Sequence, residues 1–274
     1  MTNPKTWLIT GASRGFGRRW AIAALERGDK VVATARNTAA LDDLVERFGD
    51  AILPLNLDVT NRDDVFAAVA VGHQAFGRLD VVLSNAGYGH QGAVEEVSEA
   101  EARDQLDTNF FGTMWLAQAA LPFLRAQLSG HLLAVSSVLG VSTVPSFGIY
   151  SASKFAVEGL FDVLAQEVAS FGIHVTLIEP GGYATDFNNP SSAKQSASNP
   201  AYDGVREGLA TAFAIYKFGD PDATAPAILA AVDADKPPLR LALGAGTIDQ
   251  IEGTYRDRLA TWDAWRDVTV RAQG

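Results

Sequence analysis

The residues best suited to chemistry in this sequence are Tyr150 and Lys154, in the segment Tyr-Ser-Ala-Ser-Lys. On a helix, this spacing places both side chains on one face, one turn apart. A free tyrosine titrates near pH ~10, too high for easy proton exchange at neutrality. A neighbouring ammonium stabilises the phenolate, so we expect Lys154 to lower the pKa of Tyr150 and make it a general acid or base. The alternative is an ordinary Tyr–Lys pair on a solvated helix face.

A pair of serines, Ser136 and Ser137, precedes this segment and follows an apolar run. If that run is a strand, Ser137 arrives at the end of the strand. Its hydroxyl can then hydrogen-bond the same substrate oxygen as the tyrosine.

Elements that would position these residues follow from the alternation of apolar runs and helical patterns. We expect strands at 6–10, 30–35, 52–57, 79–84, 131–136, 173–179 and 239–243. We expect helices at 15–28, 38–48, 61–76, 98–127, 150–171 and 221–233, the fourth opening with a capping box at 98–101. The pattern predicts an α/β fold, a Rossmann-like doubly wound parallel sheet of about seven strands with helices on both faces.

The composition is that of a soluble globular protein. The chain has 274 residues, 47% of them hydrophobic and 20% charged, and no linker or repeat divides it. We therefore expect residues 1–274 to form a single domain. A net charge of −10 argues against nucleic acid or an anionic membrane as a partner. No cysteine is present, no apolar leader opens the chain and the four histidines are scattered, so we expect a cytoplasmic protein without a metal site.

A glycine-rich turn follows the first expected strand. It reads Thr-Gly-Ala-Ser-Arg-Gly-Phe-Gly, and we expect its members to bind a nucleotide: Gly11, Ser13, Arg14, Gly15, Phe16 and Gly17. Glycines let the backbone approach a pyrophosphate, and the next helix offers it unpaired amides. A glycine-rich turn alone is weak evidence, but its place between a strand and a helix strengthens the prediction.

The end of the second strand indicates which nucleotide is bound. An NAD site carries an acidic residue there, whereas this strand ends in Arg36, and Arg14 can reach the same region. Two guanidinium groups suit a phosphate monoester, so we expect NADP rather than NAD. The alternative is two surface arginines. Asp58 is expected at the adenine amine, with Val59 against the ring.

Two further polar positions have ordinary and functional interpretations. Asn85-Ala86-Gly87 follows the fourth strand, and Asn and Gly are common turn residues. Asn109 lies inside a predicted helix, where asparagine is a mediocre helix former. It is either a satisfied buried amide or part of a proton path.

Taken together, these motifs resemble the short-chain dehydrogenase/reductase family, in its compact single-domain branch, from Thr6 to about Thr185. The resemblance rests on the glycine turn, Asn85-Ala86-Gly87, Asn109, Ser137, Tyr150 with Lys154, and Pro180-Gly181 followed by Thr185. The family favours homodimers and homotetramers.

The resemblance implies a proton relay coupled to hydride transfer. Tyr150 would donate a proton to a carbonyl oxygen that Ser137 orients, and Ser137 is preferred to Ser136 by its separation from the tyrosine. Lys154 would bind the nicotinamide ribose and lower the tyrosine pKa, and Asn109 would hold a water linking the lysine to solvent. The nicotinamide would be bordered by Pro180, Gly181 and Thr185, and Asn85, Ala86 and Gly87 also belong to the expected cofactor site.

The substrate side is expected to be apolar. Residues 183–219 combine a turn-rich segment with an amphipathic stretch and are typical of a lid, although an ordinary surface connection has the same composition. The expected substrate residues are Ser137, Leu139, Phe147, Tyr183 and Phe187, with His90 and Gln91 as polar contacts. Since no Arg or Lys cluster lies here, we expect an uncharged ketone or aldehyde, or the matching alcohol.

Two other functions share parts of this pattern. One is a non-catalytic NADP sensor, which commonly loses the tyrosine or the lysine. The other is a sugar-nucleotide epimerase, which has a different glycine spacing and a larger C-terminal domain. Beyond the lid, Trp262 and Trp265 are expected on one helical face, in packing or a subunit contact.

Overall fold

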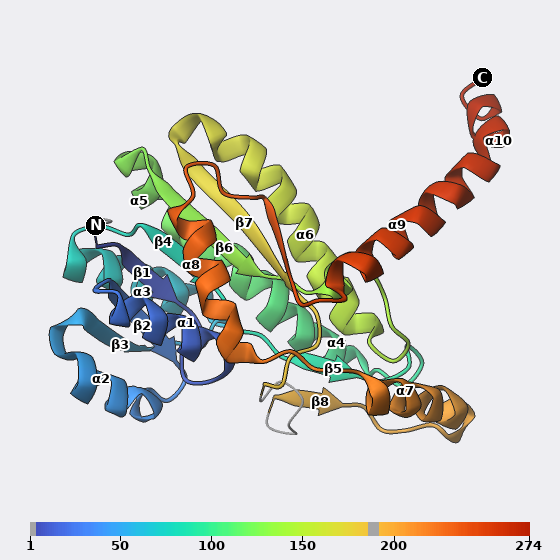
Figure 1. The fold of residues 1–274 in the computed structure, drawn as a ribbon, viewed down its shortest axis with the longest axis horizontal. Coiled ribbons are helices and arrows are strands. Elements are labelled where there is room, and N and C mark those ends of the chain that lie inside the picture. The colour runs from blue at the N-terminus through green and yellow to red at the C-terminus, as the bar shows by residue number, and fades with distance from the viewer. Residues whose placement is uncertain (1–3, 186–191) are drawn as a thin grey trace.

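A parallel sheet of seven strands lies at the centre of the computed structural model, which describes residues 4–185 and 192–274 (Figure 1). The strands are β1 (Thr6–Ile9), β2 (Lys30–Ala35), β3 (Ile52–Asn56), β4 (Val81–Ser84), β6 (Gly130–Val135), β7 (Ile173–Pro180) and β9 (Arg240–Leu243). Their order is β3-β2-β1-β4-β6-β7-β9. The chain therefore winds outward in both directions from β1 and β4, which confirms the predicted doubly wound fold and places a ligand crevice at that switch point.

Helices cover both faces of the sheet. They are α1 (Gly15–Glu26), α2 (Asp42–Phe48), α3 (Arg62–Phe76), α4 (Glu99–Leu106), α5 (Gly112–Gln127), α6 (Gly148–Val168), α7 (Asp203–Ile215), α8 (Ala225–Asp233), α9 (Thr247–Ala264) and α10 (Arg266–Arg271). Short 3₁₀ turns join them: η1 (Thr38–Leu41), η2 (Gly49–Ala51), η4 (Val138–Gly140), η5 (Ala169–Phe171), η7 (Pro200–Tyr202) and η8 (Pro221–Thr224).

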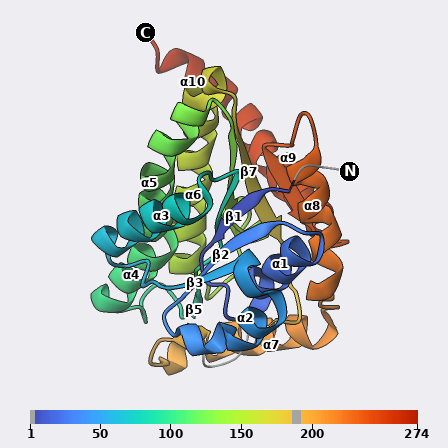
Figure 2. The ribbon, with the colours of Figure 1, turned by 90° about the vertical axis from the view of Figure 1, so that its left-hand side faces the viewer.

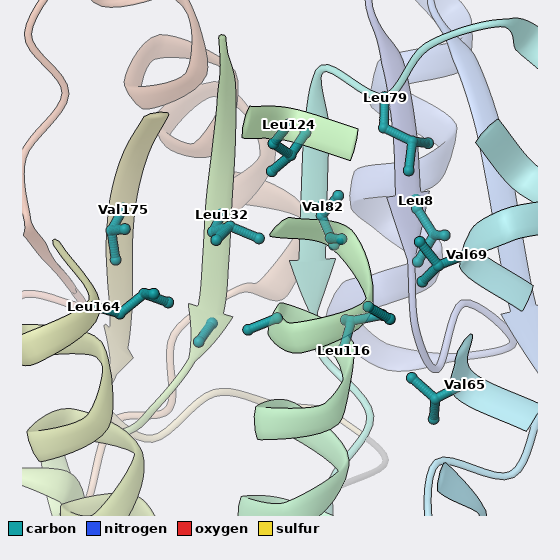
Figure 3. Packing of buried hydrophobic residues seen from close by; sticks show 14 of the residues in the cluster. Leu8, Val65, Val69, Leu79, Val82, Leu116, Leu124, Leu132, Leu164 and Val175 are labelled. Atoms are coloured by element: carbon teal, nitrogen blue, oxygen red, sulfur yellow. The ribbon is translucent and has the colours of Figure 1, made fainter. Parts of the chain in front are cut away.

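Alternate strand residues supply two separate cores, because successive side chains of a strand point to opposite faces. Leu8 and Val82 pack with α3, α5 and α6, as Figure 3 shows for part of this cluster. Ile9 and Leu83 pack instead with α1, α2 and α8. Figure 2 shows these two groups of helices on opposite sides of the sheet. The cores fix the strands, and thus the strand ends where the site lies.

The helical stretch expected at 98–127 is present but contains a π-helical turn. It begins at the predicted capping box, where Ser98 Oγ accepts a hydrogen bond from the Glu101 N–H at 3.3 Å. A π-helix, η3 (Asp107–Phe111), then separates α4 from α5. π-Helical turns of this kind are rare and concentrate at functional sites. Asn109 lies inside this turn, so the predicted helical stretch is confirmed but changes its hydrogen-bond pattern at a candidate site residue.

A small second sheet was not predicted. In it, β5 (Gly89–Gln91) pairs in parallel with β8 (Ala193–Gln195). Both strands are three residues long and largely polar, so neither carries an apolar run that sequence reasoning could detect. This pairing fixes part of the predicted lid segment beside the turn that follows β4.

The C-terminal helices α9 and α10 project away from the sheet (Figure 1). Trp262 lies in α9, whereas Trp265 lies at the junction of the two helices, and their side chains are 64% and 63% exposed. Trp265 is the C-cap residue of α9, so only Trp262 lies within the regular helix. Within the described residues, no helix is long and apolar enough to cross a membrane.

Candidate active site

A cavity of about 850 Å³ opens at the carboxyl ends of the central strands. Most residues expected at the cofactor line it: Gly11, Ser13, Arg14, Gly15, Phe16, Arg36, Asp58, Val59, Asn85, Ala86, Gly87, Pro180, Gly181 and Thr185. So do Ser137, Leu139, Phe147, Tyr150, Lys154 and Tyr183. Gly17 and Asn109 lie behind the wall, and Phe187 lies outside the described residues. The structure therefore gathers residues from six strand ends and α6 into one cavity.

Tyr150 and Lys154 lie one turn apart near the start of α6. Helix α6 begins at Gly148 rather than at the tyrosine, so both residues are held in regular helix. Their exposed fractions are only 6% each, and Lys154 Nζ lies 5.8 Å from the centroid of the Tyr150 ring. Ser137 forms a side-chain hydrogen bond with Tyr150. The three candidate catalytic groups are thus adjacent and shielded from water.

The pKa of Tyr150 moves in the direction opposite to the one expected from sequence. Burial raises it to about 12, and the hydrogen bond with Ser137 only partly offsets this effect. The physical reason is that a phenolate loses its hydration when it is buried, and this loss outweighs the local stabilising contacts. The hydroxyl therefore stays protonated at neutral pH.

The pKa of Lys154 is shifted downward, in the direction opposite to that of Tyr150. Burial lowers its pKa to about 8, and the carboxylate of Glu158 opposes that shift. Its ammonium donates a hydrogen bond to the Val135 carbonyl at 2.7 Å, which anchors it at the end of β6. With a pKa of about 8 the side chain is still mostly charged at neutral pH.

The two neighbouring serines point to different surroundings. Ser137 Oγ lies at the cavity and accepts a hydrogen bond from the Leu139 N–H at 3.1 Å, which caps the turn η4. Ser136 Oγ lies beside Gly140, where an added Cβ would approach it to 2.5 Å. The Ser136 hydroxyl also lowers the pKa of the Glu158 carboxyl group, beneath the cavity. The geometry thus distinguishes Ser137 as the serine next to Tyr150.

Asn109 is buried and bonded on both sides of its amide. Its Oδ1 accepts the Tyr88 N–H, and its Nδ2 donates to the Tyr88 carbonyl and to Ser153 Oγ, each at 3.1 Å. Ser153 in turn donates to the carbonyl of Tyr150 at 2.7 Å. The side chain therefore ties the turn after β4 to α6 directly, rather than being open to the cavity.

The glycines of the first turn have distinct physical roles. Gly11 and Gly15 have φ of +66° and +57°, a region that side-chain-bearing residues seldom adopt. Gly17 has an ordinary helical backbone but no room: an added Cβ would lie 2.4 Å from Asn85 Nδ2 and 2.6 Å from the Gly11 carbonyl. Asn85 Nδ2 itself donates to the Thr10 and Gly11 carbonyls, at 2.9 and 3.1 Å. The turn is thereby fixed to the end of β4.

The basic residues near this turn divide into two groups. Arg14 and Arg36 are exposed and line the cavity at the end of β2. Arg18 instead pairs with Asp43 at 2.5 Å, and Arg19 pairs with Asp222. The first pair thus lines the cavity, whereas Arg18 and Arg19 do not.

The substrate end of the cavity is rich in aromatic side chains. Leu139, Phe147 and Tyr183 line it as expected, and three further aromatic residues after or within α7 join them: Phe213, Tyr216 and Phe218. Phe147 lies 6.3 Å from Phe213 between ring centroids. The sequence already places all three in the amphipathic stretch of the predicted lid, with Phe213 facing the expected pocket.

Two polar expectations at this end need correction. His90 is fully buried in the small sheet, where its Nε2 lies 2.8 Å from Ser196 Oγ, and neither it nor Gln91 lines the cavity. Lys194, which was not predicted, does line it and pairs with Asp104 at 3.2 Å. His90 and Lys194 each have a partner about a hundred positions away in sequence, so no local sequence pattern predicts these contacts.

Comparison with known proteins identifies the family. The sequence model described as short chain dehydrogenase matches residues 5–196. The chain belongs to this family. Over 272 residues it is 39% identical to oxidoreductase BOA17 of Botryotinia fuckeliana, a match covering 97% of this chain and 98% of the relative. It is also 40% identical over 200 residues to a 3-ketodihydrosphingosine reductase of Bacteroides thetaiotaomicron, covering 73% and 72%.

Solved structures agree with the family assignment. A short-chain dehydrogenase from Streptomyces avermitilis has a TM-score of 0.93 and 40% identity, with 100% of both chains covered. Another, from Burkholderia cenocepacia, is in complex with NADP (TM-score 0.76, 25% identity, 95% of this chain and 97% of that one). A 3-ketoacyl-(acyl-carrier-protein) reductase from Brucella melitensis is complexed with NADH (TM-score 0.75, 25% identity, 89% and 98%).

This short-chain dehydrogenase is thus an oxidoreductase whose family uses a nicotinamide cofactor. The matched residues 5–196 include every predicted catalytic and cofactor position. The aromatic residues around α7 lie beyond the match, as do α9 and α10.

Proposed function

We propose that this protein is an NADPH-dependent carbonyl reductase, with Tyr150 as the proton donor to an uncharged, apolar ketone or aldehyde. The observation that carries the proposal is the hydrogen bond between Tyr150 and Ser137 in a cavity that Lys154 also lines. A protonated phenol beside a second hydroxyl is the arrangement that a carbonyl oxygen needs when it accepts a proton. A non-catalytic NADP sensor would have no use for it.

The residues present fit a nicotinamide dinucleotide. Gly15 has open space where its Cβ would be, so the backbone before α1 is accessible to a pyrophosphate. Gly11, Ser13 and the first turn of α1 would hold the pyrophosphate, and Asp58 with Val59 would hold the adenine. Arg14 and Arg36 would bind a phosphate on the adenosine ribose, which favours NADP over NAD. Pro180, Gly181 and Thr185 would border the nicotinamide.

Each catalytic group has a task that its surroundings support. The hydride for the carbonyl carbon would come from NADPH bound in this cavity. Ser137 orients the carbonyl oxygen, and Tyr150 donates its proton to that oxygen as negative charge develops there. Lys154, charged and anchored on Val135, favours the resulting phenolate and holds the nicotinamide ribose. Asn109 positions α6 through Ser153 and the turn after β4, next to any water that returns a proton to Lys154.

The substrate end of the cavity favours apolar molecules. Its walls are Leu139, Phe147 and Tyr183 with the aromatic residues around α7, and the charge of Lys194 is balanced by Asp104. The 40%-identical relative named as a 3-ketodihydrosphingosine reductase acts on a ketone by its name. We therefore include long-chain ketones among the candidate substrates, and propose that residues 183–219 act as the lid.

The same proposal covers the whole protein. We propose one domain over residues 1–274, in a homo-oligomer that uses small-molecule substrates, without nucleic acid, membrane or metal. The absence of cysteine is compatible with the cytoplasm.

A binding and turnover experiment tests this function. The purified protein is titrated with NADPH and separately with NADH, and then supplied with aryl ketones, aldehydes and long-chain ketones. We expect tighter binding of NADPH and its oxidation with at least one apolar carbonyl compound. Tight NADPH binding without turnover across the panel would instead support the sensor function.

A further inference from the structure

A group of charged side chains, two of them buried, joins the helix α6 to the strands β7 and β9. Arg240, at the start of β9, pairs with Glu158 and Asp162 of α6 at 3.2 and 2.6 Å. It also pairs with Glu179, near the end of β7, at 3.3 Å. Three carboxyl groups thus surround one guanidinium. We call these four residues the Arg240 cluster.

The cluster is more acidic than its single cation can balance. Glu158 and Glu179 are 5% and 2% exposed, so water solvates neither carboxylate well. Glu179 Oε1 is buried and accepts no hydrogen bond from the described residues, although Arg240 is nearby. A buried carboxylate without full pairing is costly, so such a group tends to hold a proton instead.

The cluster is coupled to the active site through α6. Glu158 follows Lys154 by four residues on this helix, so the two side chains lie one turn apart. The carboxylate of Glu158 is the charged group that opposes the effect of burial on the Lys154 pKa. Ser136, which precedes Ser137 at the end of β6, also lowers the pKa of Glu158.

We propose that Glu158, backed by Glu179 and Arg240, maintains the charge of Lys154 and thereby sets the upper pH limit of the reaction. This inference rests on the proposed function only for its catalytic consequence. Glu158 would be a positioning residue that acts through Lys154 and does not itself touch substrate. The cluster is reached from solvent past Asp162, whose side chain is 42% exposed.

The titration of the cluster follows from its composition. Burial raises the pKa of Glu179 to about 7, and the charges of Glu158 and Asp162 act in the same direction against Arg240. Burial also raises the pKa of Glu158, whereas Ser136 and Arg240 lower it. As the pH rises through neutrality, the cluster therefore loses a proton and gains a negative charge. That charge favours the ammonium form of Lys154 at the pH where it would otherwise begin to deprotonate.

Nuclear magnetic resonance tests the coupling without reference to activity. Protein labelled with ¹³C at the lysine Cε and the glutamate carboxyl is titrated, and Lys154→Met and Glu179→Gln assign the signals. In the wild type we expect a Glu179 inflection near pH 7 and a Lys154 inflection near pH 8, as their surroundings dictate. In Glu158→Gln, the Lys154 inflection should move about one pH unit lower.

A matched variant and a kinetic measurement complete the test. Glu167→Gln, an exposed change on the same helix, should leave the Lys154 inflection unchanged. The alkaline limb of kcat should move with Lys154 in Glu158→Gln, with little change in KM for NADPH. If Glu158→Gln does not fold, a second step near pH 7 in the wild-type Lys154 signal still reports the coupling. Identical Lys154 titrations in Glu158→Gln and Glu167→Gln would overturn the proposal, whether or not a substrate is found. If Glu158→Gln does not fold, the absence of the step near pH 7 in the wild-type Lys154 signal would overturn it.

Discussion

Burial determines the protonation of the two central residues more strongly than their proximity does. Tyr150 is held protonated, with its pKa raised to about 12 by burial, whereas the pKa of Lys154 is lowered to about 8 by the same cause. A protonated phenol beside a charged ammonium is the state required for donation to a carbonyl oxygen. Sequence reasoning correctly paired these residues but took only the charge of the neighbour into account, because the burial of a helix start cannot be inferred from spacing.

At the adenosine end, Arg36 is expected to select the cofactor. Arg36→Asp would remove one charge-assisted contact and place a carboxylate near the ribose phosphate. We expect NADPH binding to weaken by about tenfold or more and NADH binding to be maintained or improved. Calorimetric titration of both cofactors measures the ratio.

The control for this change is Arg47→Asp. Arg47 is an exposed arginine of α2 that pairs with Glu26 and does not line the cavity. If Arg36→Asp leaves the ratio of the two affinities as it is in Arg47→Asp, Arg36 does not contact the phosphate.

The elements that carry the motifs were largely predictable. Seven strands, the capping box of α4 and the glycine turn follow from apolar periodicity and from residues with special backbone preferences. The π-helix around Asn109 was not predictable, because apolar periodicity does not distinguish it from an α-helix and Asn109 bonds to Tyr88 and Ser153, which are distant in sequence. The β5–β8 sheet and the Arg240 cluster were missed for the same reason. Each depends on partners far apart in sequence.

The packing of α1 against the end of β4 gives a prediction at the scale of elements. Gly17→Ala would place a methyl group against Asn85 and the Gly11 carbonyl, which would separate the two strand ends. We expect a loss of about 1–3 kcal/mol in stability and weaker NADPH binding. Chemical denaturation and cofactor titration measure the two effects.

A second glycine variant provides the control. Gly159 lies within α6, exposed, with nothing within 4 Å of an added Cβ. Gly159→Ala should therefore stabilise the protein by about 0.5–1 kcal/mol through helix propensity alone. Equal effects of the two substitutions would contradict the assigned role of Gly17.

For the whole molecule, the projecting helices α9 and α10 support the proposed homo-oligomer. Their exposed apolar residues include Leu259, Trp262, Trp265 and Val270, each at least 59% exposed. Aromatic side chains so exposed on a projecting helix commonly mark an interface. We predict that Trp262→Glu with Trp265→Glu lowers the mass measured by light scattering. Val71→Glu on α3 serves as the control, and an unchanged mass in the double variant would exclude these tryptophans from the interface.

The proposed reaction is tested most directly by comparing wild type with Tyr150→Phe, which removes one hydroxyl and keeps the ring. Both proteins are titrated with NADPH and assayed with the best carbonyl compound from the panel. We predict that Tyr150→Phe binds NADPH with nearly wild-type affinity and loses turnover by about 10²-fold or more. If the variant keeps most of its turnover, Tyr150 is not the proton donor and the mechanism proposed for this site is wrong.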